Sequence, residues 1–379
     1  IQQKAFLVSQ EIAKSYNCLV FVALRPSTFY LSKQQGALSG YQNKVFSIAP
    51  PPADEVIEKR VTFALRVAEG QISPAALQQI RLDLDGIVTF LKVMLRSIKT
   101  NKEIRAFLSN ITGGNTRRVI ELVTAFCGSP NVDSEKIIDI ENRTGNYRIP
   151  LHEFTKHALL GEYSYFHPGS SLVACNVYDV SDADPKEHFL APIIISFLNM
   201  ESPVRDKDGF VKGSNIIKEM SALGFLGEQV NAAVVRLAKR RLLETPFGQF
   251  RELDVDEADG IEALQFRVTS IGNYHVRDWM TSFVFFDAVS TDTPIFDEDI
   301  RATVEALADS FSIEDRYEKA IAFRGYLQNQ WSLSNIPTRY LNFDGLVRGS
   351  EKSFEGVAAV LQKLRQNKDA GKRGGRKIR

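Results

Sequence analysis

A continuous apolar segment, residues 19–24 (Leu-Val-Phe-Val-Ala-Leu), ends at Arg25 and Pro26. Apolar runs of this length are typical of a central strand in a parallel sheet, because helices cover both faces of such a strand. A helical pattern over Gln2–Tyr16 precedes it, and a second short strand is predicted at Lys44–Ile48. Helices alternating with strands in this way predict the terminal part of an α/β core.

After the prolines at 50–52 the pattern becomes helical throughout, with no strand in between. The predicted helices are Ala53–Glu69, Ser73–Leu84, Ile87–Ile98, Glu103–Leu108 and Asn115–Cys127. The last of them begins directly after Gly113 and Gly114 and carries Arg117 and Arg118 in its first turn. Paired glycines allow positive φ and a close approach of the backbone to a ligand. A helix N-terminus also attracts phosphate.

The sequences Ala23-Leu24-Arg25-Pro26 and Gly113-Gly114-Asn115-Thr116-Arg117 together resemble two motifs of AAA+ and STAND-type P-loop ATPases. These are the sensor-1 strand and the sensor-2 segment of the helical lid. The resemblance implies that ATP is the cofactor and that Arg25 is a catalytic residue that reads the γ-phosphate. It also implies a nucleotide-binding set made of Arg25, Gly113, Gly114, Asn115, Arg117 and Arg118.

Two departures qualify this resemblance. The phosphate-binding pattern G-x-x-x-x-G-K-[ST] does not occur in the sequence, so we expect the C-terminal part of a larger ATPase. Mg²⁺ would then be held mainly by an N-terminal core, and this chain alone should not hydrolyse ATP. The stretch from Ser27 to Lys59 contains no arginine, which favours a STAND-like switch over a ring with arginine fingers.

Each motif also has a plain structural interpretation. Arg25 could cap the end of a strand or form a surface ion pair. The turn at Gly113 could be an ordinary helix start followed by two solvated arginines.

A winged-helix module is predicted further along the chain. Helices at His188–Met200, Asn215–Leu223 and Gly227–Glu244 are followed by strand-like segments at Glu262–Thr269 and Tyr274–Trp279, which is the order of this helix-turn-helix variant. In the third helix an apolar side would dock, while a side with Gln229, Ala232, Arg236, Lys239 and Arg240 would face a DNA groove. Arg236, Lys239, Arg240 and Arg241 are the candidate nucleic-acid contacts. The acidic stretch at 251–260 would repel phosphate, so docking of a protein partner is the alternative.

The C-terminal end, 367–379, is rich in glycine, lysine and arginine and is predicted to be disordered. Lys372, Arg373, Arg376 and Lys377 would bind nucleic acid without sequence preference through counterion release. A solubilising tail is the alternative.

The predicted fold class is an α/β core fragment plus mainly α structure. The expected parts are the end of a parallel-sheet P-loop NTPase core (1–52), a helical lid (53–135), a connector (136–187), a winged-helix domain (188–290), a C-terminal helical segment (291–366) and the basic tail (367–379).

Bulk composition sets the remaining limits. The net charge of +1 excludes a global field for nucleic acid, although local patches can persist. The three cysteines form no CxxC pair and suit a reducing compartment, so a cytoplasmic protein is expected. Apolar runs are too short to cross a bilayer. His152 and His157 lie off the spacing for a shared metal ligand and are expected at the surface or half-buried.

The sequence therefore predicts part of an ATP-dependent switch. Its lid would sense nucleotide and move a winged helix that binds DNA or a protein partner; self-association is also open. A non-enzymatic winged-helix DNA-binding or adaptor protein is the main alternative. A replication-initiator-like ATPase is the third interpretation.

Overall fold

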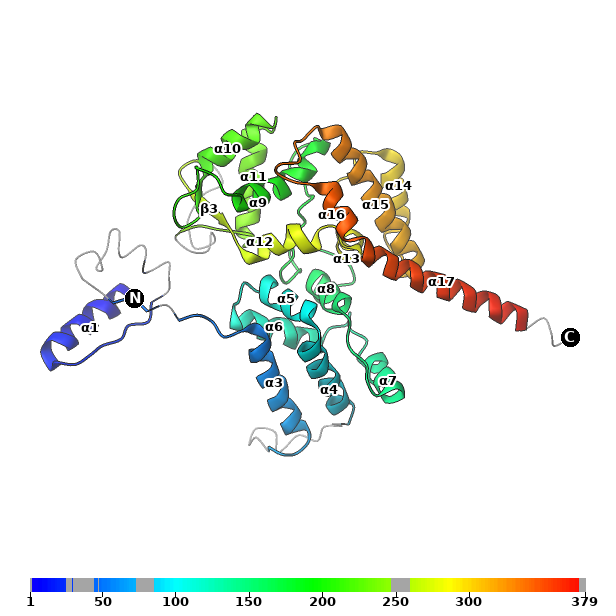
Figure 1. Cartoon of the computed structure of the whole chain (residues 1–379), viewed down its shortest axis with the longest axis horizontal. Coiled ribbons are helices and arrows are strands. Elements are labelled where there is room, and N and C mark those ends of the chain that lie inside the picture. Colours follow the sequence, from blue (N-terminus) through cyan, green and yellow to red (C-terminus); the bar gives the residue numbers. More distant parts are fainter. Residues whose placement is uncertain are drawn as a thin grey trace. The chain divides into compact units, whose positions relative to one another are not determined.

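The computed structural model describes residues 2–24, 29, 44–46, 48–72, 85–246 and 260–374, with only the backbone of 2–3, 85 and 368–374. This part of the chain is mainly helical, with one small antiparallel sheet (Figure 1). The chain divides into two compact units. Unit 1 comprises 1–49 and 197–269, and unit 2 comprises 50–196 and 270–379.

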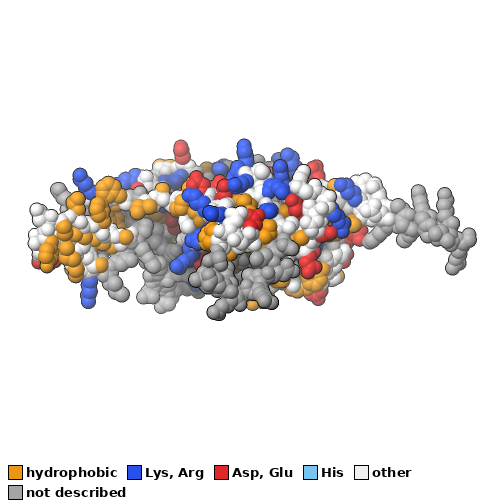
Figure 2. Space-filling view, turned by 90° about the horizontal axis from the view of Figure 1, so that it is seen from below, with side chains coloured by type: hydrophobic (Ala, Val, Ile, Leu, Met, Phe, Trp, Pro, Cys, Tyr) orange, Lys and Arg blue, Asp and Glu red, His pale blue; other side chains and the backbone are white. Residues whose placement is uncertain are grey.

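The N-terminal segment of unit 1 forms the predicted helix but not the predicted strands. Helix α1 spans Gln2–Tyr16, whereas 18–24 and the described residues of 44–48 are irregular backbone. Leu19 is 89% exposed and Phe21 is 81% exposed, so the expected buried strand is wrong for this structure. Hydrophobic side chains also gather over α1, at the left of Figure 2, where Leu7, Val8, Ile12 and Tyr16 are exposed.

The helical block at the start of unit 2 is confirmed where the structure describes it. The confirmed helices are α3 (Ala53–Ala68), α4 (Asp85–Thr100), α5 (Lys102–Ile111) and α6 (Thr116–Cys127). A further helix, α7 (Ser134–Thr144), was not predicted and packs on α4. The predicted helix at 73–84 lies outside the described residues. Asn101 caps α5 and Asp133 caps α7 by accepting backbone N–H groups, which fixes where each helix begins. Helix α3 packs on α4, α5 and α6, so a single apolar core holds the block together.

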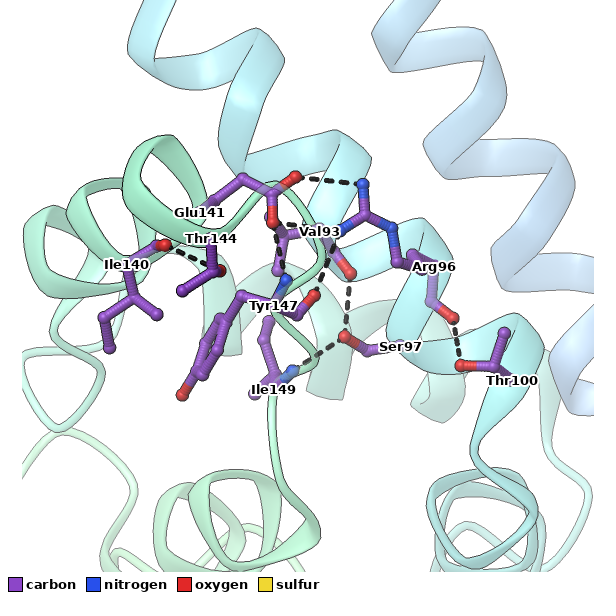
Figure 3. Close-up of polar contacts among 9 residues, drawn as sticks. All are labelled: Val93, Arg96, Ser97, Thr100, Ile140, Glu141, Thr144, Tyr147 and Ile149. Atoms are coloured by element: carbon purple, nitrogen blue, oxygen red, sulfur yellow. Dashed lines mark hydrogen bonds and ion pairs between the residues drawn. The ribbon is translucent and has the colours of Figure 1, made fainter.

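A polar clamp attaches α7 to α4 (Figure 3). The Arg96 guanidinium donates to both Glu141 carboxylate oxygens at 2.9 Å, and the Tyr147 amide donates to Glu141 Oε2 at 2.7 Å. The arginine holds the pKa of Glu141 below its usual range. Ser97 Oγ completes the clamp by accepting the Ile149 amide at 2.8 Å. The segment expected to be a connector from 136 thus belongs to the helical block.

The rest of unit 2 surrounds an aromatic core. Tyr178 is fully buried and lies within ring-contact distance of Phe285, Phe286, Phe323 and Phe343. The helices that supply this core and its cover are α8 (Leu151–Leu160), η2 (Pro185–Phe189), α13 (Phe283–Val289), α14 (Glu298–Ala306), α15 (Ile313–Ser334), α16 (Phe343–Gly349) and α17 (Glu351–Gly374). Helix α9 (Leu190–Asn199) follows η2, and its last residues belong to unit 1. Together η2 and α9 cover most of the helix that was predicted at His188–Met200.

The sheet of unit 1 has three short strands. They are β1 (Val211–Lys212), β2 (Leu243–Glu244) and β3 (Gln265–Val268), in the spatial order β1-β3-β2 with both pairings antiparallel. Helices α10 (Gly213–Ala222) and α11 (Gly227–Lys239) pack together and lie between β1 and β2 in the sequence.

Three further segments differ from their predicted structure. The helix predicted at Gly227–Glu244 ends at Lys239, and the last two residues of that range form β2. Tyr274–Trp279 was expected to be a strand, but α12 (Ser270–Tyr274) and the single π-helical turn η5 (His275–Trp279) occupy this region. The expected hairpin partner of β3 was the segment 274–279, but β3 pairs with β2, which precedes it in the sequence. The end of the chain also differs, because α17 continues to Gly374 rather than ending at Gln366.

Candidate functional site

The turn before α6 has the backbone that the paired glycines predicted. Gly113 has φ +62° and Gly114 has φ +69°, a region that side chains disfavour. The Gly113 amide donates to Asn110 O and the Gly114 amide donates to Ser109 O, each at 3.1 Å. Helix α5 therefore ends in a fixed turn, and the chain leaves it in a defined direction.

Asn115 caps the helix that follows. Its Oδ1 accepts the Arg118 amide at 3.1 Å, and the first turn of α6 contains no acidic residue. The partial positive charge of this helix end is therefore not neutralised by its own first turn. Arg117 is exposed and Arg118 is half-buried. Across the described ranges, the Arg117 guanidinium has no ion pair or hydrogen bond, which leaves it available for an anion.

The start of α12 contacts this glycine turn. The Ser270 hydroxyl donates to Asn110 O at 3.2 Å, and a Cβ on Gly113 would lie 3.8 Å from Ile271 Cδ1. On the other side, a Cβ on Gly114 would lie 3.6 Å from Pro50 Cγ. The glycine turn thus lies between the proline segment that opens unit 2 and the residues that directly follow β3.

Residues further along α12 and η5 hold this support rigid. Phe107 of α5 contacts the rings of Tyr274 and Trp279 at centroid distances of 5.8 and 5.7 Å. His275 Nδ1 lies 2.8 Å from Ile271 O, and the Cys175 amide donates to His275 Nε2 at 3.2 Å. Burial lowers the pKa of His275 to about 4. The imidazole is therefore neutral at pH 7, as its role as an acceptor requires.

Arg25, the other predicted phosphate contact, lies outside the described residues, so the structure brings together only the lid half of the predicted nucleotide site. Arg376 and Lys377 also lie outside. Lys372 and Arg373 lie in the last turns of α17, where only the backbone is described.

The candidate recognition helix α11 does not present the wide polar face that the sequence predicted. Gln229 is 2% exposed, and its Oε1 accepts the Leu226 amide at 2.8 Å, so it caps the helix instead of facing solvent. Val235 and Ala238 are also buried, which narrows the solvent side of the helix. On that side Lys239 is exposed, Ala232 and Arg236 are half-buried, and Arg236 Nε is buried. Beyond the helix, Arg240 and Arg241 are half-buried.

Two of the five histidines, His152 and His167, are exposed, and the other three are buried. His152 is at the surface as predicted, but His157 is 1% exposed and packs against Phe126, so its expected exposure is wrong. In the ranges that the structure describes, no group of three histidine, cysteine, aspartate or glutamate side chains could hold a metal ion. A search of the same ranges finds no helix long and apolar enough to cross a membrane.

Ser270 and Ile271 are the residues of this site that the sequence analysis missed. Their segment was assigned to the wing, and nothing local in the sequence connects it with Gly113. Only the tertiary packing of α12 on α5 brings the two together.

Comparison with known proteins finds no matching family model, no matching curated protein and no matching solved structure.

Proposed function

We propose that this chain carries the sensor-2 lid and winged helix of an ATP-dependent switch, with ATP bound between the lid and a P-loop core that supplies the missing phosphate loop. The observation that carries the proposal is the positive-φ turn at Gly113 and Gly114, followed by an Asn115 cap and an exposed Arg117. A guanidinium on a helix N-terminus is suited to a phosphate, because it can donate to two oxygens at once. Arg117 would contact the β- and γ-phosphates, with Arg118 beside it.

The exposed apolar residues near the N-terminus support the same proposal. Residues 19–24 have the composition of a central strand, yet Leu19 and Phe21 are exposed here. A central strand needs neighbours on both sides and helices on both faces. We infer that a P-loop core would order this segment as the sensor-1 strand and place Arg25 at its end.

The contact between the glycine turn and Ser270–Ile271 supplies a route from nucleotide to partner. A change in the position of the turn between ATP and ADP states would move the start of α12, and β3 ends two residues earlier in the chain. A ligand shifts such an equilibrium only through contacts that differ between the two states. Arg117 would provide that difference, because its contact with the γ-phosphate is lost after hydrolysis.

The element order α9, β1, α10, α11, β2, β3 and the strand order β1-β3-β2 support a winged-helix module within the predicted range 188–290. Because Gln229, Val235 and Ala238 are buried, a protein partner fits α11 better than the major groove does. DNA contacts would be limited to Arg236, Lys239, Arg240 and Arg241.

The test is ATP binding and turnover by the product of the whole gene. Arg117→Ala should weaken ATP binding about tenfold or more, because one charge-assisted hydrogen bond contributes roughly 1.5–3 kcal/mol. Arg66→Ala is the matched control, since Arg66 is an exposed arginine on α3 of the same helical block. Equal affinities for ATP in both variants and the wild type would favour the non-enzymatic adaptor.

A further inference from the structure

A pocket lies wholly within unit 2. It has a volume of about 240 Å³ and opens between α8, α13, α15 and the loop that follows α14. Three cationic side chains line it, Lys156 of α8 and Arg316 and Lys319 of α15, together with one acidic side chain, Asp287 of α13. The charge of the lining is thus three positive against one negative.

The single carboxylate is already used by two of the cations. Arg316 donates to Asp287 Oδ2 through Nε at 2.9 Å and also through Nη2. Lys319 Nζ lies 3.3 Å from Asp287 Oδ1 and is 5% exposed. Buried charges need partners, because removing them from water is costly. One carboxylate shared by two cations leaves an excess of positive charge at the base of the pocket.

Lys156 adds a third cation that this carboxylate does not pair. It is half-buried, and no described side chain forms an ion pair or hydrogen bond with its ammonium group. Burial lowers the pKa of Lys156 and the neighbouring Arg316 lowers it further, while Glu153 and Asp287 act in the opposite direction. An anion placed among Lys156, Arg316 and Lys319 would relieve this repulsion and supply the missing acceptor.

The rim of the pocket has a different chemistry. Tyr165 and Phe311 line it, their ring centroids are 5.8 Å apart, and the two residues are 42% and 69% exposed. The side-chain Nδ2 of Asn131 donates to Gly161 O at 3.0 Å and to Tyr163 O at 2.9 Å, which fixes the loop that carries Tyr165. Exposed aromatic rings at a pocket rim offer a stacking surface to a planar ligand.

We propose that this pocket binds a small ligand in which a planar ring is attached to a single phosphate, such as a nucleoside monophosphate. The phosphate would lie among Lys156, Arg316 and Lys319, and the base would stack on Tyr165 and Phe311. The volume lies below the usual range for ligand sites of roughly 300–1,000 Å³, which favours one phosphate over a triphosphate chain. The pocket shares no lining residue with the glycine turn before α6, so this ligand is distinct from the ATP proposed there.

Isothermal titration of the full chain with AMP, adenosine and inorganic phosphate tests the proposal. AMP should bind one to one, and adenosine and phosphate should each bind at least tenfold more weakly. Lys156→Gln should weaken AMP binding about tenfold, because it removes a charged contact at the partly exposed side of the pocket. Lys363→Gln, an exposed lysine on α17, should leave AMP binding unchanged.

Arg117→Ala separates the two proposals. AMP binding that survives Arg117→Ala and falls with Lys156→Gln supports this pocket, even if the lid proves not to bind ATP. The pocket assignment is overturned if AMP does not bind at millimolar concentration, if Lys156→Gln binds AMP as well as Lys363→Gln does, or if only Arg117→Ala abolishes binding. Thermal unfolding of each variant checks that a loss of binding does not come from a loss of fold.

Discussion

Two helices of this molecule, α6 and α11, were expected to present arginines to phosphate, but they differ in how far those side chains are exposed. The start of α6 keeps Arg117 in solvent after a turn whose glycines both have positive φ. Helix α11 buries Gln229, Val235 and Ala238, which leaves a narrow solvent side around Lys239. A helix terminus is determined by a few neighbouring residues, whereas the exposed face of a helix is determined by everything that packs on it. The first is therefore the stronger candidate for a phosphate contact.

The largest expected change in stability comes from truncating a buried side chain of α11. Leu237 is fully buried, so Leu237→Ala should lower the free energy of unfolding by roughly 2–5 kcal/mol through lost transfer energy and the cavity left behind. Arg117→Ala should change the same quantity by less than about 0.5 kcal/mol, because Arg117 is exposed. Urea unfolding of both variants measures the contrast, and equal losses of stability would contradict it.

The stability of the segment that supports the glycine turn should depend on pH. The pKa of His275 is about 4 in the folded chain and about 6.5 in the unfolded chain, so only the unfolded state takes up a proton between these values. Stability is fully present above pH 6.5 and is lost as the pH falls toward 4, by about 3 kcal/mol from this residue. His157 and His188, whose pKa values are also lowered by burial, act in the same direction.

Urea unfolding between pH 7 and 4 measures this loss. His275→Gln keeps an acceptor for the Cys175 amide but cannot be protonated, so its stability should depend less steeply on pH. A slope equal to that of the wild type would show that His275 does not carry the effect.

The clamp between α4 and α7 should have an intermediate effect. Glu141→Gln removes the charge that Arg96 and the Tyr147 amide share, and should cost roughly 1–3 kcal/mol, because Arg96 then lies in a partly buried site without a carboxylate. Asp139→Asn breaks an exposed pair with Arg143 on the same helix and is the matched control, with an expected cost under about 1 kcal/mol. Similar costs for the two would mean that the clamp adds little to the stability of the helical block.

The glycine turn should show the smallest change in stability. Gly113→Ala places a side chain at φ +62° and should cost about 1–2 kcal/mol by differential scanning calorimetry. Gly128→Ala is the control, because Gly128 has φ −104° and open space at its Cβ position. Gly113→Ala should also weaken ATP binding by the whole gene product, whereas Gly128→Ala should not.

How far the sequence could predict this structure depends on the range of the interactions. Local signals succeeded: the helix predicted from Asn115 begins at the Asn115 cap, and the paired glycines have the expected backbone. The Asp133 cap and the helix α7 that follows it were missed. Signals that depend on distant neighbours did not succeed. Leu19–Leu24 has a strand composition, but no described segment of the chain pairs with it as a strand. Tyr274–Trp279 was predicted to be a strand because aromatic and branched residues suit either structure.

The candidate site shows the same difference between local and long-range signals. Arg117 was found because its motif is contiguous, while Ser270 and Ile271 could not be found, since they lie far from Gly113 in the sequence and meet it only in the packed unit. The pocket around Asp287 was missed for the same reason. Its cations come from α8 and α15, which no sequence motif connects.

ATP binding by the product of the whole gene, with Arg117→Ala and Arg66→Ala beside the wild type, tests the central claim most directly. The lid assignment predicts that Arg117→Ala loses affinity for ATP about tenfold or more, while Arg66→Ala binds as the wild type does. Equal ATP affinity in all three proteins would contradict it, and the turn before α6 would then be only the start of a helix.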